Sequence, residues 1–190
     1  MIAEFILTAL PWFVGAFVVA SILVSVLFNI SGIWERMPSD EELAALHADP
    51  EAPPPPRERV VLGQFGPFVT GRRDVAGGWQ EFKGFMIGPS LRLTRRDHGV
   101  PSLCNQGFPE AIAKLINGDV TGRLRLGLTS AGLILDGSFT PQKIEFTHRP
   151  PKITQRYFLQ PKPRRYRRLT DEEIATEREL IARRLQQSPS

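Results

Sequence analysis

Residues 5–33 read FILTALPWFVGAFVVASILVSVLFNISGI, an apolar run between Glu4 and Glu35 in which no side chain ionises. A run of this length exceeds the ~20 residues that an α-helix needs to cross the ~30 Å hydrocarbon core of a bilayer. Trp12 and Trp34 mark its two ends, at a helical separation of roughly 33 Å, which is the spacing of the two aromatic belts of a membrane span. The sequence therefore predicts one transmembrane helix, with Trp12 and Trp34 as its anchors at the membrane interfaces.

Small residues recur within this predicted span at spacings that allow two helices to approach closely. They are Gly15, Ala16, Ala20, Ser21 and Ser25. Either a helix–helix packing face or a simple lipid-facing anchor agrees with this pattern, so the sequence leaves both open.

The orientation of the predicted span follows from the basic residues near it. None precedes it, whereas Arg36, Arg57 and Arg59 follow it, and positive charge favours the inner side of a membrane. The single cysteine, Cys104, agrees with a reducing compartment because a disulfide needs a pair. We expect a single-pass protein of a bacterial inner membrane, with its N-terminus outside and its soluble domain in the cytoplasm.

The chain divides into four predicted segments. They are the transmembrane anchor (1–36), a short capped helix with a proline-rich linker (37–58), a β-rich domain (59–160), and a basic segment with an amphipathic C-terminal helix (161–190). Ser39 with Glu42, and Thr170 with Glu173, are spaced as capping boxes at the starts of two helices.

Short apolar runs separated by glycine and turn residues predict strands through the third segment. Leu124, Leu126 and Leu128 alternate with Arg123 and Arg125, which is the period of a strand with one buried face. One helical pattern, ending at Asn117-Gly118, interrupts the strands. The predicted fold class is a single N-terminal transmembrane helix plus a small β-rich (α+β) antiparallel soluble domain, with one internal helix and a C-terminal helix. The pattern does not distinguish a closed barrel from a sandwich.

Two groups of arginines are candidate binding residues. The repeated Arg-Arg-Asp sequence predicts either surface ion pairs or a cluster at one sheet edge that holds phosphate or carboxylate groups. The basic run from 146 to 170 has eight lysines and arginines and no acidic residue, so it suits an anionic lipid surface, RNA, or acidic groups of a partner or of this chain. The candidates are Arg72, Arg73, Arg95 and Arg96 in the first group and Arg164, Arg165, Arg167 and Arg168 in the second.

Catalytic chemistry has little support in the sequence. His98 and Cys104 lie six residues apart, but a cysteine nucleophile needs a contacting base and an orienting third group. One cysteine and three scattered histidines do not have the spacing of a zinc site. We therefore expect no enzyme activity, no metal and no cofactor, and the lack of a recognised motif disfavours nucleic acid as a partner.

The predicted layout resembles that of accessory subunits of membrane complexes, such as the H subunit of photosynthetic reaction centres. This resemblance is one of architecture and implies a non-catalytic scaffold that docks its β domain on a larger membrane complex. Its contacts would be the transmembrane and C-terminal helices, with either a complex or a second copy as partner. The alternative is a membrane-tethered sensor, built on a small β-barrel, that binds an anionic ligand or lipid headgroup through Arg72, Arg73, Arg95 and Arg96.

Overall fold

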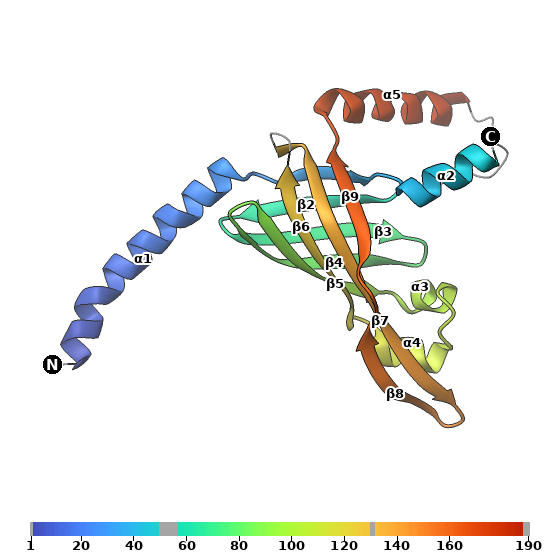
Figure 1. The fold of residues 1–190 in the computed structure, drawn as a ribbon, viewed down its shortest axis with the longest axis horizontal. Helices are drawn as coiled ribbons and strands as arrows, with labels where there is room; N and C mark the ends of the chain where they lie inside the picture. The colour runs from blue at the N-terminus through green and yellow to red at the C-terminus, as the bar shows by residue number, and fades with distance from the viewer. Residues whose placement is uncertain (1, 50–56, 130–131, 188–190) are drawn as a thin grey trace.

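The computed structural model describes residues 2–49, 57–129 and 132–187, which form nine strands and five helices (Figure 1). The helices are α1 (Ile2–Leu27), α2 (Asp40–Ala48), α3 (Val100–Asn105), α4 (Glu110–Ile116) and α5 (Asp171–Gln187). The strands are β1 (Gly32–Arg36), β2 (Arg59–Phe65), β3 (Phe68–Val75), β4 (Gly78–Ile87), β5 (Ser90–His98), β6 (Val120–Thr129), β7 (Ile134–His148), β8 (Pro151–Phe158) and β9 (Lys162–Arg168).

Eight of these strands close into an antiparallel barrel. Their order is β6-β5-β4-β3-β2-β1-β9-β7, and β7 pairs again with β6, which completes the circle. The short strand β1 pairs with β2 on one side and with β9 on the other, so the first barrel strand in the sequence is hydrogen-bonded to the last. β8 pairs with the outer part of β7, from Gln142 to His148, and extends beyond the barrel.

The barrel interior is apolar because inward residues alternate with outward ones along each strand. Leu124 and Leu126 of β6 point inward while Arg123 and Arg125 point outward, as the sequence pattern predicts. The main core consists of Ile30, Trp34, Val60, Leu62, Val69, Phe82, Met86, Leu91, Leu93, Leu124, Leu126, Leu135, Phe139 and Tyr166.

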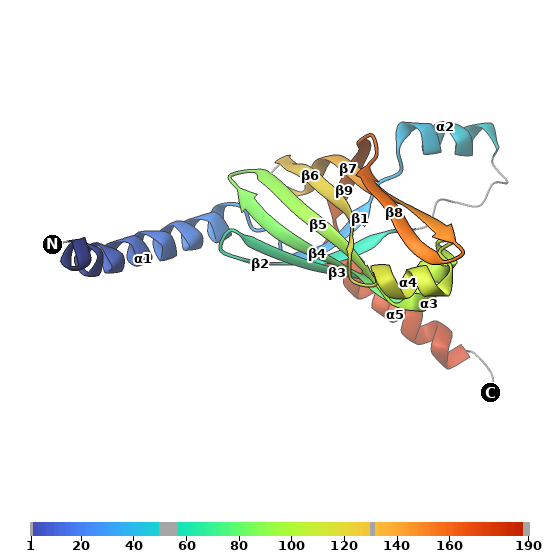
Figure 2. The ribbon, with the colours of Figure 1, turned by 90° about the horizontal axis from the view of Figure 1, so that it is seen from below.

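A second, smaller core lies beside the barrel. Helices α3 and α4 pack there with the β7–β8 hairpin, and its buried members are Leu103, Ile112, Ala113, Ile116 and Ile144. Phe108 and Phe146 pack against this cluster with ring centroids 5.9 Å apart. Figures 1 and 2 both place α3, α4 and the hairpin far from the end of the barrel at which α1 enters.

Two barrel hairpins close through Gly-Pro turns. Gly66-Pro67 joins β2 to β3, and Gly88-Pro89 joins β4 to β5. Both glycines have positive φ, 58° and 52°, which the first central position of such a two-residue turn requires and which other residues adopt with difficulty. These turns set the register in which the outer faces of β2 to β5 are aligned.

The prediction of a transmembrane anchor is wrong. Within the residues that the structure describes, no helix is both long enough and apolar enough to cross a membrane. The apolar run extends past the end of the helix: α1 stops at Leu27, and Ile30 and Trp34 belong to the barrel core. The predicted single-pass localisation in a bacterial inner membrane, with an outer N-terminus and a cytoplasmic domain, is wrong for the same reason.

The predicted fold class needs further correction. The β-rich character is confirmed, but eight of the strands form a closed barrel, and two short helices interrupt the strands instead of one. Among the described residues no transmembrane helix precedes the barrel. Part of the predicted tail is a barrel strand, because Lys162–Arg168 forms β9 between β1 and β7. Prolines 53–56 of the predicted linker lie outside the described residues.

Candidate interaction surfaces

Among the described residues, the main core of the barrel leaves no room for a ligand. The space enclosed among its core side chains is about 10 Å³, and nine residues, including Trp34, Phe82 and Tyr166, line it. A volume of ~10–15 Å³ is the least that holds one water molecule. Small-molecule sites occupy ~300–1,000 Å³. The candidate interaction surfaces of the barrel are therefore sought on its outside.

The first group of predicted arginines does not form one cluster. Arg72 and Arg96 lie on the outer face in a row with Glu81, and they bind Asp74 (2.9 Å) and the carbonyl oxygen of Gly118 (2.9 Å), respectively. A closed barrel has no edge at which all four predicted arginines meet.

The other two arginines of this group point toward the interior at the end of the barrel. Arg73 lies 3.4 Å from Glu58, and Arg95 lies 3.0 Å from Asp97. Asp97 is almost completely buried, and it also accepts a hydrogen bond from the hydroxyl of Thr121 at 3.0 Å. Such partners satisfy the buried carboxylate, so this polar layer closes the barrel end and is not an open anion site.

The second group of predicted arginines is bound mostly within the chain. Arg165 binds Asp136 at 2.8 Å, and Arg167 binds Glu35 at 2.7 Å. Arg168 donates to the carbonyl oxygens of Asn29 and Ser31. The guanidinium of Arg164 lies over the ring of Phe139, 5.8 Å from its centroid. Of the readings that the sequence left open, pairing with the chain's own acidic groups is the one that these contacts favour.

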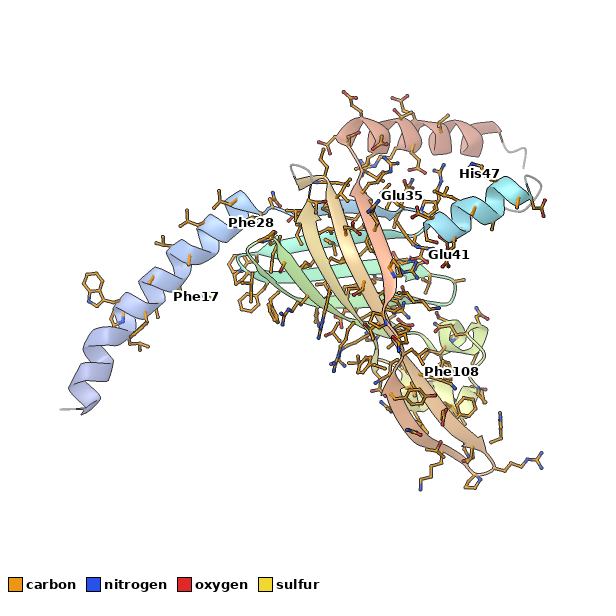
Figure 3. All side chains as sticks on the ribbon, in the orientation of Figure 1. Phe17, Phe28, Glu35, Glu41, His47 and Phe108 are labelled. Atoms are coloured by element: carbon orange, nitrogen blue, oxygen red, sulfur yellow. The ribbon has the colours of Figure 1, made fainter. Side chains whose placement is uncertain are left out.

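Glu35 is the centre of a charged cluster between the barrel and α5 (Figure 3). Burial raises the pKa of Glu35, but hydrogen bonds from Arg167 and Arg59, with their positive charges, outweigh it and hold the pKa below its usual value. The same two arginines bind α5, since Arg59 contacts Glu177 and Arg167 lies 2.6 Å from Glu173. We call these five residues the α5 latch, because they connect α5 to the outer faces of β1, β2 and β9.

His98 and Cys104 are not arranged as a nucleophile and its base. The ring of His98 stacks on Trp79 with centroids 4.9 Å apart and lies 3.7 Å from Glu81. Cys104 is a free thiol that packs against the second core. Among the described residues, no group of three or more His, Cys, Asp and Glu side chains is placed to hold a metal ion.

Helix α1 presents an exposed apolar surface. Every described side chain from Leu10 to Ala20 is exposed, with Trp12 at 79%, Phe13 at 72% and Phe17 at 57%. Figures 1 and 2 show α1 extending away from the barrel, and Figure 3 shows Phe17 on it. The predicted packing residues Gly15, Ala16 and Ala20 lie within this exposed stretch, whereas the side chains of Ser21 and Ser25 are outside the described set. Trp12 is exposed, but Trp34 is in the barrel core and anchors no surface.

The connection between α1 and the barrel is held by several contacts. Phe28 packs against the main core, Ile30 is fully buried, and the backbone N–H of Ile30 donates to Gln64 at 3.0 Å. Together with the two hydrogen bonds from Arg168, these contacts fix the residues that follow α1. The barrel therefore determines where α1 leaves its surface.

Sequence reasoning missed a group of exposed aromatic residues on the barrel wall, Phe65, Phe68 and Phe85. The alternation of residues along β2 could have shown that Phe65 is exposed. Val60 and Leu62 point inward, so Phe65, an odd number of residues away from both, points outward. Comparisons of the chain with protein-family models, with curated proteins and with solved structures found no match, so they give no support to the resemblance in layout.

Proposed function

We propose that this protein is a non-catalytic accessory subunit that binds a partner protein through the exposed apolar face of α1, with the β-barrel as the rigid body that holds the helix. The exposure of Trp12, Phe13 and Phe17 is the observation that carries the proposal. Exposed apolar patches above a few hundred Å² generally mark interaction sites.

The three aromatic side chains of α1 supply about half of the area that a specific interface needs on one partner. At ~200 Å² for a large aromatic side chain, the exposed fractions of these three residues correspond to roughly 400 Å². A stable protein–protein interface buries ~800 Å² on each partner. Exposed aliphatic residues of the same helix, among them Val14, Val18 and Leu23, add to this area. The expected partner is a protein with an apolar groove, which receives an apolar helix through side chains at helical spacing.

The filled barrel interior supports this role over ligand sensing. An anionic-ligand sensor that uses Arg72, Arg73, Arg95 and Arg96 is the second hypothesis. It has less support, since these side chains lie on two faces of the wall and are engaged by Asp74, Glu58, Asp97 and Gly118.

The experiment compares what two tagged versions of the protein retain when they are purified from their native cells. In the test variant, Trp12, Phe13 and Phe17 are replaced by Ser. In the matched control, three exposed leucines elsewhere, Leu115, Leu133 and Leu159, are replaced by Ser. A partner that is stoichiometric with the parent protein and with the control, but lost from the α1 variant, supports the proposal. Recovery of the bare chain, or of the chain with lipid alone, overturns it.

A further inference from the structure

The outer wall of the barrel carries a continuous cross-strand row of five residues. In register order they are Phe65 of β2, Phe68 of β3, Phe85 of β4, Arg92 of β5 and Arg125 of β6. The three phenylalanines are 85%, 55% and 41% exposed, and both arginines are exposed. We call this set the Phe–Arg row; its first half is apolar and its second half is positively charged.

The two arginines of the row stand out from the other outward arginines. They are directly opposite one another on β5 and β6, and like charges in such a cross-strand pair destabilise a sheet. In the described part of the chain neither guanidinium has an ion-pair or hydrogen-bond partner, whereas Arg72 binds Asp74 and Arg165 binds Asp136. An acidic group from outside would relieve the repulsion by accepting hydrogen bonds from both.

The geometry of the row limits what can occupy it. Strands in a sheet are ~4.8 Å apart, so the row measures roughly 19 Å along the curved outer wall of the barrel. Each of the strands β2 to β6 already pairs on both sides, and a partner strand cannot be added to a closed barrel. The partner must therefore contact side chains, and an α-helix of about 13 residues is as long as the row measured along the wall.

We propose that the Phe–Arg row binds an amphipathic helix of a partner protein, with apolar residues over Phe65, Phe68 and Phe85 and acidic residues at the end that meets Arg92 and Arg125. Charge complementarity with the unpaired arginines identifies this occupant. The row shares no residue with α1, although its first member, Phe65, follows Gln64, whose side chain binds the backbone of Ile30 just after that helix. The row therefore goes beyond the interface of the proposed function.

The probe is an alanine-based helical peptide with leucines along one face and two glutamates at one end of that face. Its binding to the full chain is measured by fluorescence anisotropy, beside a peptide with lysines in place of the glutamates. The glutamate peptide should bind the parent protein, and the lysine peptide should not. Replacing the three phenylalanines by Ser should abolish binding.

Arginine variants test the positively charged half of the Phe–Arg row. Arg92→Gln with Arg125→Gln should weaken binding by about five- to tenfold, as expected for exposed ion pairs. The matched control is Arg72→Gln with Arg96→Gln, which removes the same charge from the same wall but off the row, and it should leave the affinity unchanged. Unchanged midpoints of urea unfolding confirm that the variants are folded.

Several results overturn the proposal. They are equal binding of the two peptides, an equal loss in both arginine pairs, binding of anionic vesicles without the peptide, and self-association of the chain that the phenylalanine variant abolishes. The last two results would assign the row to lipid or to a second copy. Because α1 is intact in every variant, failure here leaves the proposed function untouched.

Discussion

Replacing Trp34 by Ala should cost a large part of the stability of this barrel. Trp34 is 1% exposed, lies in the main core, and donates its indole N–H to the carbonyl oxygen of Ile30 at 2.8 Å. Truncation of a buried Trp to Ala typically costs about 3–5 kcal/mol. The loss of the donor leaves the buried carbonyl of Ile30 without this partner, which places the expected value in the upper part of that range. The total free energy of unfolding of a folded protein is only about 5–15 kcal/mol.

The measurement is thermal unfolding followed by far-ultraviolet circular dichroism. For a chain of this size, a loss of 3–5 kcal/mol lowers the thermal midpoint by roughly 6–20 °C. Trp12→Ala is the matched control, because it removes the same side chain from an exposed position and should change stability by less than about 0.5 kcal/mol. Trp34→Phe, which keeps a ring but loses the N–H, should lie between the two. Equal effects of Trp34→Ala and Trp12→Ala would refute the placement of Trp34 in the core and of β1 in the barrel.

Three other perturbations test the latch and the wall. The pKa of Glu35 is lowered in the folded state, so the stability that its carboxylate contributes is fully present above the usual pKa near 4.5 and is lost as the pH falls through the lowered pKa. The urea midpoint should therefore drop when the pH is lowered through this range. Glu35→Gln should make that drop smaller. Glu173→Gln with Glu177→Gln removes the latch carboxylates of α5, so hydrogen exchange should quicken in α5 and not in the barrel strands. Gly84→Ala places a Cβ against the carbonyl oxygen of Arg92 in β5 and should destabilise the barrel by about 1–3 kcal/mol in urea unfolding, whereas Gly15→Ala meets no atom within 4 Å and should not.

Local patterns predicted the elements whose signals are local. The alternation of Leu124 and Leu126 with Arg123 and Arg125 placed β6, and the capping box of Ser39 with Glu42 forms as expected at the start of α2. Each of these signals lies within a few residues of the feature that it predicts. The register of two strands that follow one another in the sequence is also determined locally, by the turn between them.

The missed features depend on distant residues. Ile30 and Trp34 continue an apolar run, and hydropathy alone does not show whether such residues are buried by lipid or by a barrel. Lys162–Arg168 has a charged, proline-containing sequence that gives little strand signal, and its pairing partners Glu35 and Asp136 are far away in the chain. The contact of Arg167 with Glu35 joins residues 132 positions apart. Long-range pairing of this kind has no short-range sequence signature.

The position of β1 explains why one strand of five residues influences the barrel core, α1 and α5. It is the only strand between β2 and β9 in the described barrel, so without it two strand edges would be exposed. Its outward residue Glu35 binds the two arginines that hold α5, and its inward residue Trp34 fills the core. The segment just before it fixes the point at which α1 leaves the barrel. An apolar helix can bind a partner at a defined angle only if its base is rigid, and here the pairing of β1 on both sides supplies that rigidity.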